Sequence, residues 1–255
     1  MCELFGFTSK HEKDLRNYLR EFFSHSVRHP HGWGLATFEK GKVNTITEPV
    51  SAVKSEIIEN VIDNISPQKT FIGHIRLATV GSLEKNNCHP FSIKDCEERD
   101  WTFAHNGTIF NGMTLYKYRE TQKGSTDSER VLMYFIDMIN ENIKKKSSSL
   151  DITERCNIID KAITAISKRN KLNILLFDGE LFYVHSNMKN TLFMKEEAGE
   201  VTFGTVTYDD VGWENCPLCR LLVYKDGELI YEGKKHDNEY VDSISNIGNC
   251  VNFNL

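Results

Sequence analysis

Cys2 directly follows the initiator methionine, so removal of Met1 would leave an N-terminal cysteine that carries a thiol and a free α-amine. A thiol has an ordinary pKa of about 8.5 and an α-amine one of about 7.7 to 8. Part of the amine is therefore uncharged at neutral pH and can take the thiol proton, which places a nucleophile and its base on one residue. Because the chain holds seven cysteines, the position needs corroboration.

Residues 73–81, with the sequence GHIRLATVG, form a polar cluster at the end of an apolar run. Arg76 and Thr79 lie here between glycines, and the guanidinium could bind a substrate carboxylate through two parallel hydrogen bonds. The alternative is a surface ion pair at a strand end, which needs no function.

Residues 101–107, WTFAHNG, form an apolar run that we expect to turn abruptly at Asn106-Gly107. The Asn106 amide and the unobstructed backbone N–H of Gly107 would be two donors for an oxyanion. A common Asn-Gly hairpin turn is the alternative. We expect His105, like His74, to orient its loop rather than transfer protons, and we count His105 with the substrate-binding residues.

A third cluster, residues 124–129, precedes a predicted helix. Helix capping accounts for Ser125, Thr126 and Glu129, but it leaves Asp127 free to receive an ammonium group. Together the clusters and Cys2 supply a thiolate, two oxyanion donors, a cation for a carboxylate and an anion for an ammonium. That set describes hydrolysis of the side-chain amide of an amino acid.

Amphipathic stripes predict the helices that position these groups. Thr126 and Glu129 have the spacing of a capping box before the third helix. The predicted helical segments are residues 11–29, 53–65, 131–143 and 158–166.

Strand-like runs alternate with these stripes, and Asp178-Gly179 and Asp226-Gly227 are typical of tight hairpin turns. Residues 144–149 are expected to form a solvated loop inside a single domain, residues 1–255. Grouped helices and hairpins favour a layered α+β fold with antiparallel sheets. The predicted runs are residues 34–39, 70–76, 101–105, 172–177, 181–185, 191–195, 201–206 and 219–224.

The composition is that of a globular protein, with 40% hydrophobic and 26% charged residues and a net charge of −5. No segment concentrates basic residues, so we expect no nucleic-acid partner. No apolar run reaches the roughly 18 residues of a membrane span, and Glu3 stands where a secretory signal carries positive charge. We therefore expect a cytoplasmic protein with reduced cysteines, no membrane partner and no cofactor.

The combination of these segments resembles the class II glutamine amidotransferases, which are N-terminal nucleophile hydrolases. The matching segments keep the order and similar spacing of that family over the first 130 residues. They are Met1-Cys2 with Gly6, the turn His31-Gly32-Trp33-Gly34, GHIRLATVG at 73–81, His89-Pro90-Phe91, FAHNGTI at 103–109 and STDSE at 125–129.

The resemblance implies a four-layer αββα sandwich with Cys2 at the end of a central strand. It makes Cys2 the nucleophile and Asn106 and Gly107 the oxyanion donors. Arg76 would bind the α-carboxylate of the substrate and Asp127 its α-ammonium. Further substrate-binding residues would be Thr79, Trp33 and Gly32, with Gly32 and Gly34 giving a mobile loop that lies against the substrate.

Two features depart from the larger members of that family. Val80 stands where glucosamine-phosphate synthases carry histidine, and the chain has no residues left for an acceptor-binding domain. The resemblance is therefore to stand-alone members and to the related γ-glutamyl hydrolases of thiol metabolism. The substrate would be glutamine or a γ-glutamyl compound, with a separate ammonia-accepting synthase as a further partner in one version.

Two alternatives stay open from the sequence. A non-catalytic amino-acid-binding protein could keep the same pocket, and retention of Met1 would favour it because a blocked amine cannot act as a base. Cys216-Pro217-Leu218-Cys219 has the spacing of a metal or redox motif. It lacks matched partners for a structural zinc site, and it leads into a predicted strand rather than a helix.

Overall fold

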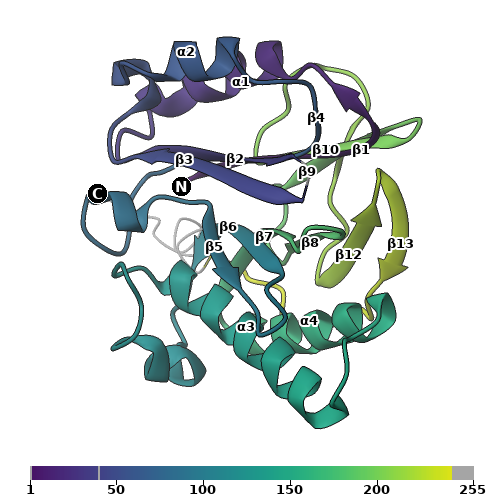
Figure 1. Ribbon diagram of the computed structural model, residues 1–255. Coiled ribbons are helices and arrows are strands. Elements are labelled where there is room, and N and C mark those ends of the chain that lie inside the picture. Colours follow the sequence, from purple (N-terminus) through teal and green to yellow (C-terminus); the bar gives the residue numbers. More distant parts are fainter. Residues whose placement is uncertain (1, 40, 243–255) are drawn as a thin grey trace, which may run out of the picture.

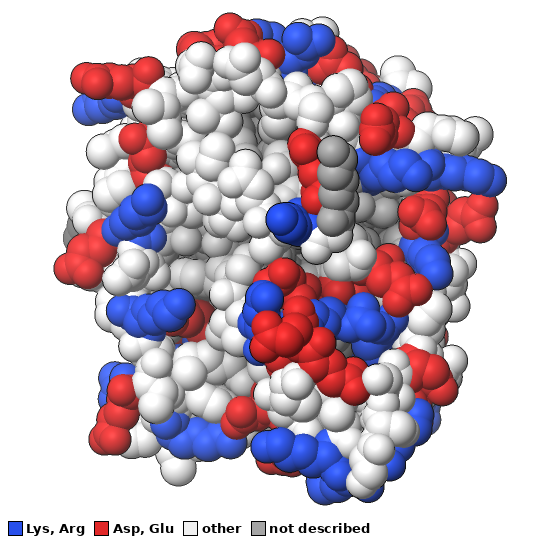
Figure 2. Space-filling model, viewed as in Figure 1, with Lys and Arg blue, Asp and Glu red and all other residues white. Residues whose placement is uncertain are grey.

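The computed structural model describes residues 2–39 and 41–242. Within these residues two antiparallel sheets face each other, with helices on the two outer faces, so the layers follow the order α, β, β, α (Figure 1). This arrangement confirms the predicted α+β four-layer sandwich. On the face shown in Figure 2, basic and acidic side chains are interspersed.

The first sheet has the strand order β11-β9-β10-β1-β4-β2-β3. Its strands are β1 (Glu3–Lys13), β2 (Trp33–Glu39), β3 (Lys42–Glu48), β4 (Gln68–Ile75), β9 (Phe193–Glu197), β10 (Glu200–Gly204) and β11 (Trp213–Asn215). The second sheet has the order β13-β12-β8-β7-β6-β5. Its strands are β5 (Phe91–Lys94), β6 (Asp100–Thr108), β7 (Lys171–Phe177), β8 (Phe182–Ser186), β12 (Arg220–Lys225) and β13 (Glu228–Glu232).

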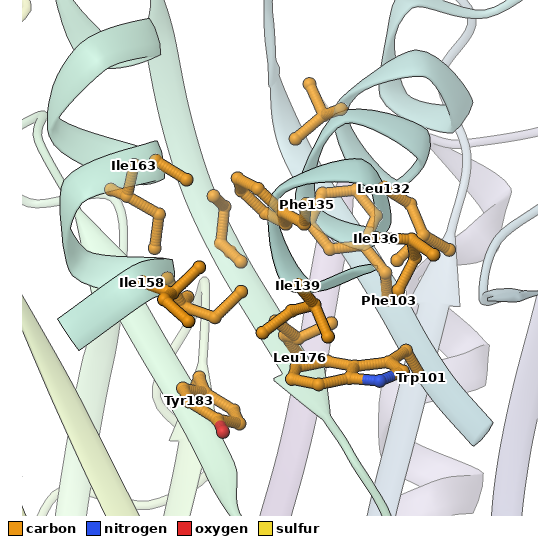
Figure 3. Close-up of a cluster of buried hydrophobic side chains, with 14 of the residues drawn as sticks. Trp101, Phe103, Leu132, Phe135, Ile136, Ile139, Ile158, Ile163, Leu176 and Tyr183 are labelled. Carbon is orange, nitrogen blue, oxygen red and sulfur yellow. The ribbon is translucent and has the colours of Figure 1, made fainter. Parts of the chain in front are cut away.

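Two helices cover each sheet: α1 (Arg16–Ser24) and α2 (Ile58–Asp63) the first, α3 (Asp127–Lys146) and α4 (Ile152–Ser167) the second (Figure 1). Short 3-10 turns are η1 (His25–Val27), η2 (Ala52–Lys54), η3 (Lys85–Asn87) and η4 (Met113–Tyr118). Apolar side chains fill the three spaces between the layers. Figure 3 shows the space under α3 and α4, where Phe135 and Ile139 pack on side chains of the second sheet. Each layer therefore holds its neighbour by burial of apolar surface.

β1 lies in the interior of its sheet, paired with β10 on one side and β4 on the other. Its side chains are buried on both faces, with Leu4 in the space between the sheets and Phe5 and Phe7 under α1. Cys2 therefore precedes a strand whose position is fixed by two neighbours, as the resemblance implied.

The helix predicted over residues 11–29 is too long at both ends. Residues 11–13 continue β1, and the α-helix covers Arg16–Ser24 before η1. α3 begins after Thr126, whose side chain accepts a hydrogen bond from the Glu129 N–H at 3.3 Å, as predicted. α3 continues through Lys146 and ends at Ser147 with a φ of 58°, so the expected loop at 144–149 begins later than predicted.

The predicted turn at Asn106-Gly107 is wrong. β6 continues to Thr108, and Asn106 and Gly107 pair with Asn173 and Leu172 of β7. A Cβ atom on Gly107 would collide with the carbonyl oxygen of Lys171, so glycine serves a close approach between strands rather than a turn.

The turns at the other two predicted sites are present. Asp226 and Gly227 have positive φ values of 49° and 75° between β12 and β13. Gly179 has a φ of 87° between β7 and β8. These left-handed conformations are those that Gly and Asp adopt most readily in hairpin turns.

Candidate active site

The Cys2 sulfur lies against the backbone of Leu77, two residues beyond the end of β4. The Leu77 N–H donates to Sγ at 3.3 Å, and the thiol donates to the Leu77 carbonyl oxygen at 3.4 Å. Burial raises the pKa of the thiol, while the Leu77 N–H and the Arg76 charge lower it and the Asp127 carboxylate raises it. The two charges predicted to bind the substrate head therefore act directly on the sulfur.

Arg76 follows β4 immediately and is buried. Its guanidinium donates to the carbonyl oxygens of Ser82 and Val80 at 2.9 and 3.0 Å, which shapes the loop after the strand. Thr79 lies on this loop and is exposed. The loop that carries Thr79 is therefore held by the residue predicted to bind the α-carboxylate.

Asn106 and His105 are buried neighbours near the end of β6 with contrasting hydrogen bonding. The His105 Nδ1 lies 3.0 Å from Ser128 Oγ, and its Nε2 lies 3.0 Å from the Lys171 carbonyl oxygen. Burial lowers the pKa of His105, although the Asp127 charge raises it. The neutral His105 ring thus donates from Nε2 and accepts at Nδ1, as a positioning group does. The Asn106 side chain, in contrast, makes no hydrogen bond within the described residues.

Asp127 is the first residue of α3 and is buried. One carboxylate oxygen accepts the backbone N–H of Ile109 at 2.7 Å, and the other makes no hydrogen bond within the described part of the chain. Thr126 caps the helix and Glu129 accepts from the backbone N–H groups of Lys123 and Gly124. The second Asp127 oxygen is therefore available to a ligand.

A cavity of about 380 Å³ opens beside the sulfur. It brings Cys2 and Asn106 together, whereas Arg76, Asp127, His105 and Thr79 do not line it. Such a volume suits a small-molecule ligand. The lining residues are Cys2, Glu3, Arg28, His29, Leu77, Asn106, Asn190, Thr191, Thr205 and Val206.

Several of these lining residues carry polar groups that the sequence analysis did not select. Glu3 begins β1, and Arg28 and His29 follow η1. Asn190 lies between β8 and β9, and Thr205 follows β10. Arg28 and His29 come shortly before the HGWG turn, which is a weak sequence signal that they lie near the site. Nothing in the sequence links Asn190 or Thr205 to Cys2.

The turn at 31–34 differs from the predicted mobile loop. Gly34 lies within β2, paired with Thr47 and His74. Trp33 is fully buried in the space under α1, and its Nε1 donates to Glu48 at 3.0 Å. Gly32 has a φ of 143°, and a Cβ there would lie 2.7 Å from the Cys88 sulfur. The Trp33 side chain therefore packs in the core under α1.

Residues 1–198 match the family described as glutamine amidotransferases class-II. That match spans most of the chain and all of the predicted site residues. The protein belongs to the class II glutamine amidotransferases. Its sheets, helices and Cys2 at the head of a central strand are those that this family resemblance implied.

One curated relative and two solved structures show what this chain is similar to. An uncharacterized protein of Methanocaldococcus jannaschii is 28% identical, over 92% of this chain and 72% of its own length. The crystal structure of a predicted glutamine amidotransferase from Pseudomonas aeruginosa is 20% identical with a TM-score of 0.61. The match covers 90% of this chain and 100% of the other chain. Glutamine phosphoribosylpyrophosphate amidotransferase from B. subtilis is 18% identical with a TM-score of 0.66, over 91% of this chain. This chain spans 49% of that enzyme, and the structural likeness shows the fold.

Other features of this chain concern metals and membranes. Within residues 2–39 and 41–242, no group of three or more His, Cys, Asp or Glu side chains is placed to hold a metal ion. Cys216 and Cys219 are buried free thiols, and β12 follows them, as predicted. Among the described helices, none combines the length and apolar character needed to cross a membrane.

Proposed function

We propose that this protein hydrolyses the side-chain amide of glutamine or of a γ-glutamyl compound, with Cys2 as the nucleophile after removal of Met1. The observation that carries the proposal is the shared cavity: the Cys2 sulfur and the Asn106 amide, which has no hydrogen-bond partner within the described residues, line the same space. An unpartnered amide at a cavity wall is free to donate a hydrogen bond to a ligand.

The raised pKa of the Cys2 thiol supports a role for a local base. Burial disfavours the thiolate, so the thiol stays protonated at neutral pH until a base removes the proton. The α-amine of an N-terminal Cys2 would be that base, since it belongs to the same residue and its ordinary pKa is close to neutral.

In the proposed reaction, the sulfur attacks the amide carbon and the α-amine takes the thiol proton. The Asn106 amide and the Gly107 N–H stabilise the oxyanion of the tetrahedral intermediate. The C–N bond then breaks, the α-ammonium gives its proton to the leaving nitrogen, and a thioester remains on Cys2. Water attacks the thioester, which releases glutamate and restores the thiol.

The head of the substrate would be bound by charge. Arg76 would receive the α-carboxylate and the available oxygen of Asp127 the α-ammonium. The effect of both charges on the Cys2 pKa supports this assignment, because it requires them to lie near the sulfur. Thr79, Gly32 and Trp33 stay predicted contacts of the substrate.

Intact mass of the native protein tests the nucleophile and the processing together. The protein is measured before and after reaction with a diazo-ketone analogue of glutamine, which alkylates a reactive thiol. We expect a mass that lacks Met1 and a single adduct, and a Cys2→Ala variant that gains no adduct and hydrolyses no glutamine. A protein that retains Met1 and binds glutamine without hydrolysis would instead be a non-catalytic amino-acid-binding protein.

A substrate panel separates the two versions of the activity. Glutamine and several γ-glutamyl amides are compared by release of glutamate. One compound cleaved much faster than glutamine indicates a γ-glutamyl hydrolase. Slow cleavage of all of them indicates a subunit that delivers ammonia to a separate synthase.

A further inference from the structure

The cavity beside Cys2 contains the predicted oxyanion donor but not the predicted binding groups for the substrate head. Asn106 lines it, whereas Arg76 and Asp127 reach the sulfur through their charges without lining it. In a planar amide the acyl chain and the nitrogen substituent leave the carbonyl carbon in different directions. If the head is bound by Arg76 and Asp127, which do not line this cavity, the cavity is the space beside the sulfur that remains for a substituent of the leaving nitrogen.

The cavity has one cation that no acid within the described residues neutralises. Arg28 is exposed, and its guanidinium forms no ion pair or hydrogen bond with another described residue. The acid of the cavity is Glu3, whose carboxylate lies 2.9 Å from His25 Nδ1 and 3.7 Å from His29 Nδ1. Glu3 is therefore already bonded to two histidines, whereas the Arg28 guanidinium is available to a ligand.

The remaining polar groups of the wall favour acceptors on a ligand. Thr205 Oγ1 already accepts the backbone N–H of Leu4 at 3.0 Å, which leaves its hydroxyl proton for donation. The Asn190 side chain makes no hydrogen bond within the described residues, so its amide can donate as well. Thr191, in contrast, donates to Met188 and accepts from Asn173, so it is already satisfied.

We propose that Arg28 makes this amidotransferase selective for γ-glutamyl compounds whose leaving amine carries an anionic group. This inference rests on the proposed function and adds the substrate class. A guanidinium matches a carboxylate or a phosphonate with two parallel hydrogen bonds, and Asn190 and Thr205 supply donors beside it. Free glutamine has no substituent on its leaving nitrogen and leaves this part of the cavity empty.

The test compares γ-glutamylglycine with γ-glutamylglycinamide, which differ only in the charge of the leaving amine. γ-Glutamyl-aminomethylphosphonate distinguishes a carboxylate preference from a phosphonate preference. Each is assayed with the wild type, Arg28→Ala, Arg28→Lys and the control Arg16→Ala. Arg16 is exposed and paired with Asp14, outside the cavity.

We expect the wild type to prefer an anionic substrate over the amide by about tenfold in kcat/KM. This is the order of magnitude that one hydrogen bond to a charged group contributes to binding. Arg28→Ala should bring the ratio close to one, Arg28→Lys should retain part of it, and Arg16→Ala should keep it whole. A wild-type ratio near one, or an undiminished ratio in Arg28→Ala, overturns the inference.

Binding to the Cys2→Ala protein separates this inference from the proposed reaction. Calorimetry with γ-glutamylglycine and γ-glutamylglycinamide measures the preference without turnover. Tighter binding of the anionic compound that is lost on adding Arg28→Ala supports the role of Arg28, even if the wild type hydrolyses nothing and the proposed function fails. Equal binding of both compounds overturns the role of Arg28, whatever the activity.

Discussion

Strands β6 and β7 connect two ends of the sandwich that treat buried polar groups in opposite ways. At the end where β7 leads into Asp178, that buried carboxylate lies 3.2 Å from Arg155 Nε and accepts the Tyr183 hydroxyl at 2.9 Å and the Leu181 N–H at 2.7 Å. At the other end of the same strands, the Asn106 amide faces a cavity without a partner among the described residues.

The difference distinguishes polar groups that stabilise the fold from polar groups that are available to a ligand. Burying a charge is costly, and the Asp178 end meets that cost with ion pairs and hydrogen bonds inside the protein. The Asn106 end leaves donors unused, which the fold tolerates where a ligand can complete them. Along these two strands, the unpartnered amide marks the end that carries the proposed site.

Removal of Asp178 should give the largest effect, and on stability. Asp178→Ala leaves Arg155 buried with one of its two acidic partners, the half-buried Glu180. We expect a loss of about 3 kcal/mol in the free energy of unfolding, measured by urea denaturation, with the kcat of the folded protein unchanged. The matched control is Glu141→Ala in the exposed pair with Lys145, which should cost no more than about 0.5 kcal/mol.

Removal of the Asn106 amide should act on turnover instead. Asn106→Ala should lower kcat about 10²- to 10³-fold while the melting temperature changes little, because no described residue bonds to the amide. Its pairing partner in β7, Asn173, is the control, since that amide donates to Thr191 and accepts from Ser186. Asn173→Ala should mainly lower stability. Near-normal turnover of Asn106→Ala would contradict the oxyanion assignment.

Acid should lower the free energy of unfolding first through groups at the end of the sandwich that carries the proposed site. His74 and His89 lie with ring centroids 4.2 Å apart, and all four ring nitrogens lack hydrogen-bond partners among residues 2–39 and 41–242. Burial lowers the pKa of His74 to about 3 and that of His89 well below its usual range, and the Arg76 charge lowers both further. The unfolded chain takes up these protons from about pH 6.5, so stability falls as the pH drops below that value.

This loss amounts to as much as about 1.4 kcal/mol per histidine and pH unit between pH 6.5 and 5, above the range where carboxyl groups titrate. Urea denaturation at several pH values measures it. His89→Phe should show a shallower pH dependence than the wild type. An unchanged slope would mean that His89 does not stay neutral in the folded protein.

The sequence predicted helices from one-sided apolar stripes and interior strands from short apolar runs, such as 172–177 in β7. α3 and α4 show clear apolar stripes because one face packs on the second sheet and the other meets solvent. β1 was not among the predicted runs because its apolar part, Leu4 to Phe7, is short and its exposed end was assigned to the predicted helix 11–29. β3 and β13 were missed because they are edge strands with few buried residues.

The site was predictable in its motifs and not in its walls. Arg76, Asn106 and Asp127 stand in compact segments whose residue types suit one chemistry. The prediction of a turn at Asn106-Gly107 was wrong because the pairing of β6 with β7 outweighs the local preference of Asn-Gly for turns. Arg28 and Thr205 meet at the cavity only because η1 and the end of β10 both lie beside the start of β1, a tertiary fact without a local pattern.

The place of Cys2 at the head of an interior strand has a practical consequence for producing the protein. Cys2 lines the cavity, so residues added before it would begin beside the proposed reaction space. An affinity tag fused at the amino terminus would acylate the proposed base and crowd the reaction space. Recombinant material intended for kinetics should carry no amino-terminal tag, or one that a protease removes immediately before the cysteine.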